Sequence, residues 1–335
     1  MIKVSKKGQP QISIIVPVYN GEKFIKKSID ELLKIKSSKE IIVINDCSTD
    51  NSLKLLKRYK NKIVLIDLEE NKGVSSARNL GIAKSTGKYI GFVDIDDSVE
   101  CEMYDEMLKK IENNDADVCV CNYDEIYEDS DLKVGSKYNL PNETTDHRTT
   151  LSLFLTDKIS PAIWDKLYKK ELLKDISFQK SLAVGEDILF CLNVFMKANK
   201  TCYIDKVFYH YLQQSNSVMH KISPKLLQFK DVVTNIDKIE KEKLKQNFKD
   251  EFEYFELEMI TRGIHSISML CNKNTSKIAQ EYLKRYYDKK DFNRIIKSKY
   301  YSKSIKLEIL VLKIFGIKFH LFLMPVYKLI RNKMR

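Results

Sequence analysis

The sequence predicts an α/β fold, with a mostly parallel sheet covered by helices on both faces, followed by a separate α-helical region. Over the first hundred residues, short apolar runs alternate with amphipathic helical patterns, which is the arrangement of a parallel sheet with crossover helices. Between Pro224 and Pro325 the chain has no proline, only two glycines, and charged helical patterns throughout. We therefore expect one domain over residues 1–220 and a helical region over residues 221–335.

The expected strands are short runs rich in β-branched residues. They cover residues 11–18, 40–45, 63–68, 89–93 and 116–121. Between the first two runs, apolar residues recur every three or four positions from Ile25 to Leu33, which predicts an amphipathic helix. A second helix is expected after the capping residues 46–50, and a third over residues 73–83.

The most informative stretch of the chain, Asp94-Ile95-Asp96-Asp97, follows the fourth expected strand. In a parallel sheet, the carboxyl ends of the strands share one edge, and ligands bind there. Three acids within four residues repel one another unless they share a cation, and oxygen ligands of this kind suit Mg²⁺ or Mn²⁺. A solvated acidic turn is the structural alternative.

Polar side chains also follow the other expected strands, so the same sheet edge gathers the groups that a nucleotide needs. A carboxylate such as Asp46 can accept a hydrogen bond from the imide of a base, and Arg78, early in a helix, can offset phosphate charge. Two alternatives stay open: Asp46 as a cap of the following helix, and Arg78 paired with a local acid.

Four motifs carry a family resemblance. They read IIVPVYN, VINDCSTDNS, NKGVSSARNLGI and FVDIDD, and residues 164–168 (WDKLY) and 185–187 (GED) continue the series. This ordered set resembles glycosyltransferase family 2, whose members are inverting, metal-dependent sugar transferases of GT-A fold, and in particular its capsule, teichoic-acid and lipopolysaccharide branch. The resemblance covers roughly residues 10–220. It implies a nucleotide-sugar half over about 10–100 and an acceptor half over about 101–220.

The resemblance also implies roles for individual residues. Asp187 would be the general base, beside Glu186, and Asp96 with Asp94 would bind Mn²⁺ or Mg²⁺. The residues implied to bind the donor, a nucleotide-diphospho-sugar expected to be UDP-linked, are Pro17, Tyr19, Asn20, Asp46, Lys72, Arg78 and Asp94. One carboxylate suffices for inversion, because the metal stabilises the departing diphosphate and no general acid is required. The alternative for Asp187 is electrostatic stabilisation of a helix N-terminus.

The acceptor side is expected to include Trp164, Lys166 and Ser217. Trp164 could stack on a sugar ring or equally belong to the core. His210 is a candidate third metal ligand, the alternative being a packed histidine. Leu212 stands where the family often has an arginine, so a cation that would contact phosphate or a phosphorylated acceptor is missing. The motif of processive synthases and membrane-spanning helices are both absent from the sequence, so we expect one sugar to be transferred per encounter.

Charge and cysteine content predict the compartment. The seven cysteines are scattered without zinc-site spacing and no signal peptide precedes the first strand, so we expect a cytoplasmic chain. The net charge is +12, and residues 301–335 hold eight cations against Glu308 alone. Residues 303–335 are too charged to span a membrane, and we expect a basic amphipathic helix on the inner face of the plasma membrane. A core or homo-oligomer helix is the alternative. No nucleic-acid recognition motif accompanies the charge.

The expected function is therefore transfer of a sugar to a hydroxyl of a cell-surface glycan, or of a lipid-linked or teichoic-type acceptor. One alternative is a catalytically inactive sugar-nucleotide-binding scaffold at the membrane. A weaker one is a nucleotidyltransferase. Such an enzyme would carry a glycine-rich loop with basic residues straight after its first strand, where this chain reads PVYNG.

Overall fold

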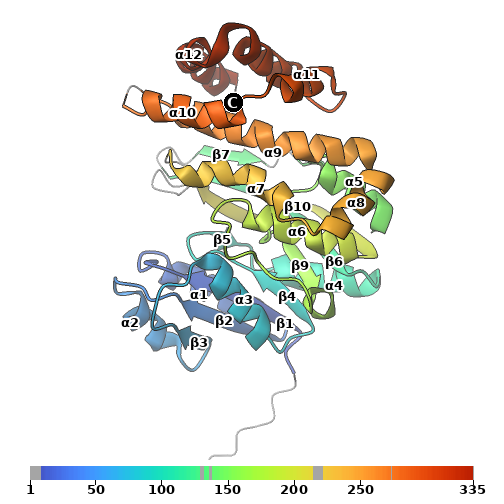
Figure 1. Cartoon of the computed structure of the whole chain (residues 1–335). Coiled ribbons are helices and arrows are strands. Elements are labelled where there is room, and N and C mark those ends of the chain that lie inside the picture. Colours follow the sequence, from blue (N-terminus) through green and yellow to red (C-terminus); the bar gives the residue numbers. More distant parts are fainter. Residues whose placement is uncertain (1–8, 129–131, 136–137, 214–221, 273, 335) are drawn as a thin grey trace, which may run out of the picture. The chain divides into compact units, whose positions relative to one another are not determined.

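The computed structural model divides the chain into two compact units, each described separately below (Figure 1). The described residues are 9–128, 132–135, 138–213, 222–272 and 274–334, with side chains to residue 323. Unit 1 comprises Met1–Phe154, Lys158–Ser181 and Glu186–Gln213. Unit 2 comprises Leu155–Asp157, Leu182–Gly185 and Gln214–Arg335.

Unit 1 is built on a ten-stranded sheet with the order β3-β2-β1-β4-β9-β6-β10-β5, to which β7 and β8 add at β6 and β10. The strands are β1 Ile12–Val18, β2 Lys39–Asn45, β3 Val64–Asp67, β4 Tyr89–Phe92, β5 Ser98–Val99, β6 Val118–Tyr127, β7 Leu132–Gly135, β8 Thr145–Asp146, β9 Lys166–Lys169 and β10 Lys200–Gln213. The first four in the sheet order pair in parallel, as do β6 and β10. The predicted α/β fold with a mostly parallel sheet is confirmed.

Two details of the sheet differ from the sequence prediction. The fifth expected strand runs much further than residue 121, to Tyr127, because it pairs along its whole length with β10. The segment Lys166–Lys169, expected as an acceptor-side motif, is itself a strand, inserted antiparallel between β4 and β6. Its four residues are too few for a periodic pattern, so only the pairing in the folded sheet identifies it.

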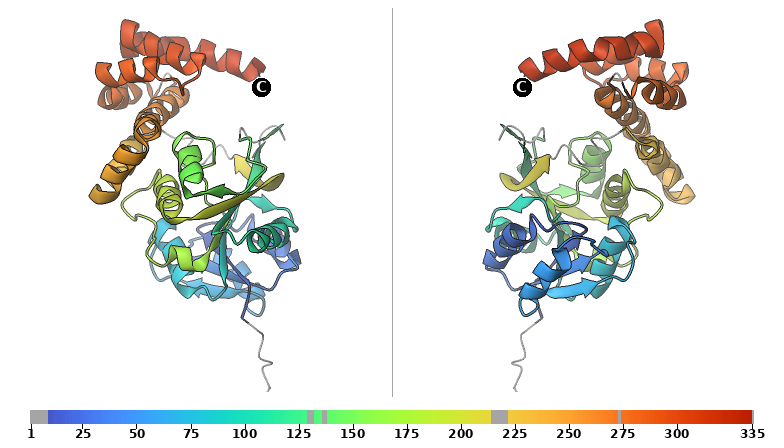
Figure 2. Two further views of the ribbon diagram at one scale, coloured as in Figure 1. Left: turned by 90° about the vertical axis from the view of Figure 1, so that its right-hand side faces the viewer. Right: turned by 90° about the vertical axis from the view of Figure 1, so that its left-hand side faces the viewer.

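Helices cover both faces of this sheet. Those of unit 1 are α1 Ile25–Lys34, α2 Ser52–Leu56, α3 Val74–Lys84, α4 Met103–Asn113, α5 His147–Leu155 and α6 Glu186–Lys197. Successive residues of a strand point to opposite faces. A Cβ on Gly91 would lie 2.4 Å from the ring of Tyr104 in α4, whereas Phe92 contacts Phe190 of α6 edge to face at 5.9 Å. Thus α4 and α6 lie on opposite sides of the sheet, as Figure 2 shows.

Unit 2 is helical, as predicted for the C-terminal region. Its helices are α7 Phe229–Thr234, α8 Lys238–Asn247, α9 Lys249–Leu270, α10 Ser276–Tyr286, α11 Lys289–Lys297 and α12 Lys303–Met334. The long helix α12 bends at Gly316, whose φ of 77° is left-handed and favours glycine. Within the described residues, no helix is long and apolar enough to cross a membrane.

His320 of α12 is buried in unit 2 and predicts acid sensitivity. Its Nε2 lies 2.9 Å from Ser268 Oγ, and burial lowers its pKa below the usual 6.5, with His265 adding to the effect and Glu308 opposing it. The unfolded chain therefore takes up a proton near pH 6.5 that the folded chain takes up only at lower pH. The contribution of His320 to the free energy of unfolding is therefore fully present above pH 6.5. It is lost as the pH falls towards the pKa of His320 in the folded chain, by up to about 1.4 kcal/mol per pH unit.

We expect His320→Gln, which keeps a side-chain hydrogen-bonding group for Ser268 but does not titrate, to reduce this loss. The measurement is urea unfolding followed by circular dichroism at pH 7.5 and pH 5.5. His147→Gln is the matched control, since His147 lies in unit 1, and it should lose stability with acid as the wild type does. Equal acid sensitivity of His320→Gln and the wild type would contradict the assignment.

Candidate active site

The loop that opens α3 is fixed by Asp46, at the end of β2. Its two carboxylate oxygens accept from the backbone N–H groups of Lys72, at 2.7 Å, and Gly73, at 2.8 Å. Gly73 has a φ of 81°, which permits this turn, and the Lys72 side chain is 52% exposed. Asp46 does not cap α2, the helix that follows it. At the start of α2 it is Asp50 that accepts a hydrogen bond, from the Ser52 N–H.

The end of β1 is tied to the same region. Asn20, with a φ of 53°, donates its N–H to Ser48 Oγ at 3.0 Å and accepts from the Thr49 N–H at 2.8 Å. Left-handed backbone at a non-glycine residue is uncommon and persists where the surroundings hold it. Tyr19 is 52% exposed, as a ring that stacks on a base must be, while Pro17 is buried in β1. The predicted donor residues at the first two strand ends therefore lie beside one another.

Arg78 joins the acidic strand end to α6. It donates to Asp94 Oδ1 at 2.9 Å and to Glu186 Oε1 at 3.2 Å, and its side chain is 7% exposed. Burial would lower its pKa, but the fields of Asp94 and Glu186 outweigh burial and raise it. The guanidinium also lies 5.4 Å from the Phe178 ring centroid. The structure thus places Arg78, buried, between two carboxylates distant in sequence, which differs from the surface arginine paired with a local acid that was the alternative from the sequence.

The three acids after β4 do different things. Asp97 is buried and accepts from the Tyr209 hydroxyl at 2.6 Å and the Leu212 N–H at 2.8 Å, so it fastens this turn to β10. Burial, with repulsion from Asp96 and Asp94, raises the pKa of Asp97. The Asp94 N–H in turn donates to the Tyr209 hydroxyl at 3.2 Å. Asp94 and Asp96 are partly exposed, so a ligand could reach both carboxylates.

The Glu186-Asp187 pair forms the first turn of α6. Asp187 Oδ1 accepts from the Ile188 N–H at 2.8 Å, and the field of Asp187 also raises the pKa of Arg78, after the larger effects of Asp94 and Glu186. The general-base candidate therefore lies in the same electrostatic cluster as the acidic turn, although some ninety residues separate them in sequence.

On the acceptor side, Trp164 packs in an aromatic stack. Its ring lies 4.2 Å from Tyr209 at an interplanar angle of 11°, and Tyr123 meets it edge-on at 4.7 Å. Trp164 is 8% exposed. Of the two interpretations left open from the sequence, this geometry favours the core, because one face of the ring is already covered by Tyr209.

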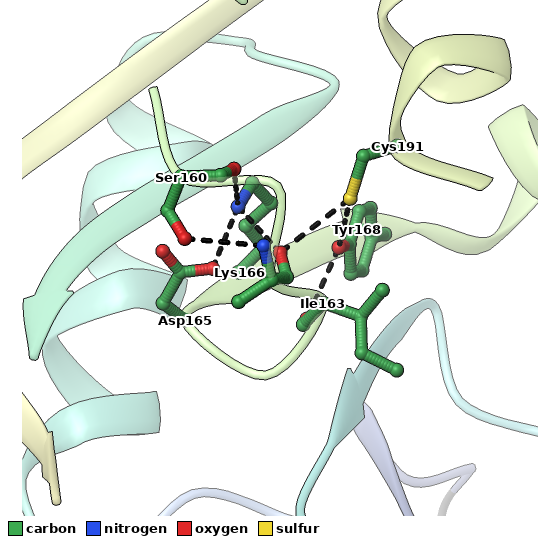
Figure 3. Close-up of polar contacts among 7 residues, drawn as sticks. Ser160, Ile163, Asp165, Lys166, Tyr168 and Cys191 are labelled. Carbon is green, nitrogen blue, oxygen red and sulfur yellow. Dashed lines mark hydrogen bonds and ion pairs between the residues drawn. The ribbon is translucent and has the colours of Figure 1, made fainter. Parts of the chain in front are cut away.

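Lys166 is in the interior, so an acceptor could not touch it in this structure. Its ammonium donates to Ser160 O at 2.8 Å, Ala162 O at 2.6 Å and Asp165 Oδ1 at 2.6 Å (Figure 3). An ammonium has three donors, and these contacts use all of them. The acceptor role predicted for Lys166 therefore needs correction: the residue holds the segment before β9 in place. Ser217, also predicted on this side, lies outside the described residues.

His210 lies on β10 between two carboxylates. Its Nδ1 is 2.6 Å from Asp124 Oδ1 and its Nε2 is 3.0 Å from Glu100 Oε1. Both ring nitrogens are engaged, so a metal bond from His210 would require one of these contacts to be released. His210 as a third ligand stays a prediction.

The acidic turn fits a divalent ion of the kind that binds with a phosphate ligand. Among the described residues, no three histidine, cysteine or acidic side chains converge as a ready-made metal site. Mg²⁺ is commonly bound by one or two carboxylates together with substrate phosphates and water, so a full protein cage is not needed. Burial raises the pKa of Asp97 most, and repulsion from Asp96 and Asp94 adds to it; a cation at the turn would relieve that repulsion.

Sequence reasoning missed two residues that build the site, Tyr209 and Phe178. The Tyr209 hydroxyl donates to Asp97 and accepts from the Asp94 N–H, so it holds both ends of the acidic turn. The Phe178 ring stacks on Phe190 at 4.0 Å and lies against the Arg78 guanidinium. The Asn79 side chain forms two hydrogen bonds with the backbone of Phe178. No local pattern marks either residue, because both act through contacts with distant parts of the chain.

Because Arg78 contacts both Asp94 and Glu186, even its replacement by lysine should reduce stability. We expect Arg78→Lys to lose one of the two carboxylate contacts, because an ammonium is not a planar fork, and to destabilise unit 1 by about 1.5–3 kcal/mol. Urea unfolding measures the loss, and Arg58→Lys on the exposed Lys57–Tyr59 turn is the control. Wild-type stability of Arg78→Lys would show that the lost contact contributes nothing to stability.

Comparison with known proteins supports the fold and the family. The profile described as "Glycosyl transferase family 2" matches residues 13–175. The uncharacterized glycosyltransferase EpsJ of Bacillus subtilis (strain 168) is 32% identical over 222 residues, 62% of this chain and 63% of that protein. The poly(ribitol-phosphate) beta-N-acetylglucosaminyltransferase TarS of Staphylococcus aureus (strain Mu50) is 30% identical over 218 residues, 62% of this chain and 37% of that one. The matches thus span less than two thirds of these relatives.

Solved structures show the same architecture. The crystal structure of S. aureus TarS 1–349 in complex with UDP-GlcNAc has a TM-score of 0.64 at 20% identity and covers 95% of this chain and 91% of that one. A mannosyltransferase, PcManGT from Pyrobaculum calidifontis, in complex with GDP-Man and Mn²⁺, has a TM-score of 0.53 at 12% identity, over 91% of this chain and 87% of that one. These identities support the GT-A fold alone. Together with the profile and the ordered motifs, they lead to one conclusion: residues 13–175 of this chain match glycosyltransferase family 2.

Proposed function

We propose that this protein is an inverting glycosyltransferase that moves a sugar from a nucleotide-diphospho-sugar to an acceptor hydroxyl, with Asp187 as the general base. The observation that carries the proposal is the Arg78 bridge, which brings Asp94 of the acidic turn and Glu186, the neighbour of Asp187, to one guanidinium. The carboxylates proposed to serve the donor and the acceptor are thereby close together, which supports a transfer reaction.

The donor is proposed to be UDP-linked. Its support is the likeness to TarS, a protein solved with UDP-GlcNAc, and the set of strand-end groups at Tyr19, Asn20, Asp46 and Lys72. The exposed Tyr19 ring would stack on the base, and Asp46 would accept from it. Arg78 would act on the diphosphate indirectly, by orienting Asp94, because both of its terminal nitrogens already contact carboxylates.

Asp94 and Asp96 are proposed to hold Mn²⁺ or Mg²⁺ against the donor diphosphate, with His210 as a further candidate ligand. When bound, such an ion supplies charge stabilisation to the leaving diphosphate. On the acceptor side, Asp187 would take the proton of the attacking hydroxyl as that oxygen bonds to the anomeric carbon. Base catalysis of this kind is worth roughly 10²–10⁴-fold. Ser217 remains a candidate for an acceptor contact, whereas the packing of Trp164 favours the core.

The acceptor is proposed to be a cell-surface glycan, or a lipid-linked or teichoic-type molecule. The relative TarS, named as a poly(ribitol-phosphate) beta-N-acetylglucosaminyltransferase, supports this class. Because the last 35 residues hold eight cations and one acid, we also propose peripheral attachment to the inner face of the plasma membrane. An inactive sugar-nucleotide-binding scaffold is the rival, and the intact Glu186-Asp187 pair in the site disfavours it.

Asp96→Ala should weaken metal-dependent UDP binding by about tenfold or more, since the variant removes one charged ligand of the proposed ion. Isothermal titration calorimetry with UDP, in manganese and in chelator, measures the effect. Asp115→Ala, in a turn distant in sequence, is the control. Unchanged UDP affinity of Asp96→Ala in manganese would remove Asp96 from the metal site.

The proposed function is tested by incubating the protein with a panel of UDP-sugars and manganese, and following release of UDP. We expect one UDP-sugar to be hydrolysed, or to raise the unfolding temperature, well above the others. Binding of UDP-sugars without any turnover, in the presence of candidate glycan acceptors, would favour the scaffold instead. Release of pyrophosphate from UTP and a sugar phosphate would point to a nucleotidyltransferase.

A further inference from the structure

Helix α12, dark red in Figure 1, exposes a row of large apolar side chains. We name this row the α12 apolar face; it consists of Leu307, Leu310, Ile314, Phe315, Phe319 and Phe322. Their exposed fractions run from 36% for Leu310 to 74% for Phe322. Exposed apolar residues scattered singly need no explanation, but residues at helical spacing along one side form a contiguous patch.

The face continues across the bend of the helix. The rings of Phe315 and Phe319 lie 4.8 Å apart, and those of Phe319 and Phe322 lie 6.4 Å apart, so aromatic contacts join the two sides of Gly316. Ile309 and Leu312 are each 1% exposed, which shows that another side of the same helix already serves the core of unit 2. The side chains of the α12 apolar face therefore do not contribute to the core of unit 2.

The positive charge of the chain is concentrated in the same region. Residues 289–335 contain thirteen lysines and arginines against Asp291 and Glu308, which is +11 of the whole chain's +12. The other 288 residues are thus close to neutral. Lys303 and Lys318 are exposed on α12 itself. A helix that carries an exposed apolar ridge and exposed lysines, in the region of the sequence with most of the net charge, fits a partner that is apolar inside and anionic outside.

We propose that the α12 apolar face inserts into the headgroup boundary of a bilayer that contains anionic phospholipid, with the surrounding lysines and arginines on the lipid phosphates. This inference rests on the membrane association proposed above and specifies its surface. A second copy of the chain would bring one strongly cationic segment against another, which Coulomb repulsion opposes. Nucleic acid would satisfy the charge but not the six apolar side chains.

The test is flotation of the full chain with vesicles of phosphatidylcholine containing 30% phosphatidylglycerol, compared with pure phosphatidylcholine. We expect binding to the anionic vesicles, weakened by salt. Lys303→Gln/Lys318→Gln should lower the affinity about 25-fold, since each cation near such a surface contributes about fivefold. Phe315→Ser/Phe322→Ser should lower it at least about tenfold, because two inserted rings are lost.

Two matched controls distinguish the effect of the α12 apolar face from the effect of losing exposed charge or an exposed apolar side chain elsewhere on the protein. Ile239→Ser removes an apolar side chain that is 67% exposed on α8, and Lys54→Gln/Lys57→Gln removes two exposed cations at and just after α2. Both should float as the wild type does. If the phenylalanine variant does not fold, the lysine variant alone decides, because it leaves the apolar side chains in place.

Several results would overturn the inference. They are no flotation of the wild type, equal flotation with pure phosphatidylcholine, or flotation of both α12 variants at the wild-type level. A homodimer that Phe315→Ser/Phe322→Ser dissociates, with no vesicle binding, would assign the face to self-association. UDP release, measured on the same samples without vesicles, keeps failure of this inference distinct from failure of the proposed transferase activity.

Discussion

Asp187→Asn is expected to reduce sugar transfer by roughly 10²–10⁴-fold while leaving UDP affinity near that of the wild type. The amide cannot accept the proton of the attacking hydroxyl, but it retains an oxygen that can accept from the Ile188 N–H, as Asp187 does now at 2.8 Å. The local helix start should therefore survive. Transfer is measured with the UDP-sugar identified by the panel, and UDP affinity by calorimetry.

The competing interpretation of Asp187 is electrostatic support for the α6 N-terminus, which would be worth about 0.3–1 kcal/mol. In that case Asp187→Asn would lower the unfolding temperature slightly and keep its turnover. Asp250→Asn, which removes an acid from the first turn of α9, is the matched control for a helix-terminus effect. Full turnover of Asp187→Asn would eliminate this residue as the base.

Lys166→Met is expected to destabilise unit 1 by about 3–5 kcal/mol, since it leaves the Asp165 carboxylate buried without its counter-charge. In the wild type the two side chains are 0% and 1% exposed and lie 2.6 Å apart. Replacing both residues, as Asp165→Leu/Lys166→Met, should recover most of the loss, because no uncompensated charge remains. Urea unfolding measures both variants.

The loss in Lys166→Met should grow with pH. Burial already raises the pKa of Asp165 in the wild type, against the opposing effect of Lys166. The pKa of Asp165 is higher in the folded chain than in the unfolded chain. The contribution of Asp165 to the free energy of unfolding is therefore present below its unfolded pKa and is lost as the pH rises through its folded pKa. Without Lys166 the pKa rises further and the window widens.

The exposed pair Lys88–Glu112 is the control for this interior pair, and Lys88→Met should cost less than about 1 kcal/mol. If the double variant is as unstable as Lys166→Met, the pair is not the reason for the loss. The double variant also tests the acceptor role predicted from the sequence. A folded double variant with an unchanged acceptor KM would confirm that Lys166 is structural, whereas a raised KM would restore the predicted contact.

Local patterns were enough for the parallel half of the sheet. The strands at Ile12–Val18, Lys39–Asn45 and Tyr89–Phe92 lie within one or two residues of the expected runs, because buried strands are continuous apolar segments bounded by polar turns. Strand β9 escaped prediction for the opposite reason. Four residues carry no period, and its place between β4 and β6 exists only once both of those strands are paired.

The sequence by itself predicted which polar strand ends would come together, since in a parallel sheet these ends lie along one edge and their polar residues are visible as motifs. It did not predict Tyr209 or Phe178. Only the tertiary structure decided what each residue does there. Arg78 could have faced phosphate or a carboxylate, and Lys166 could have been exposed or buried; the folded chain places both among acids. Charge partners are chosen by distance in space, and residues 78 and 186 become neighbours only after the sheet has formed.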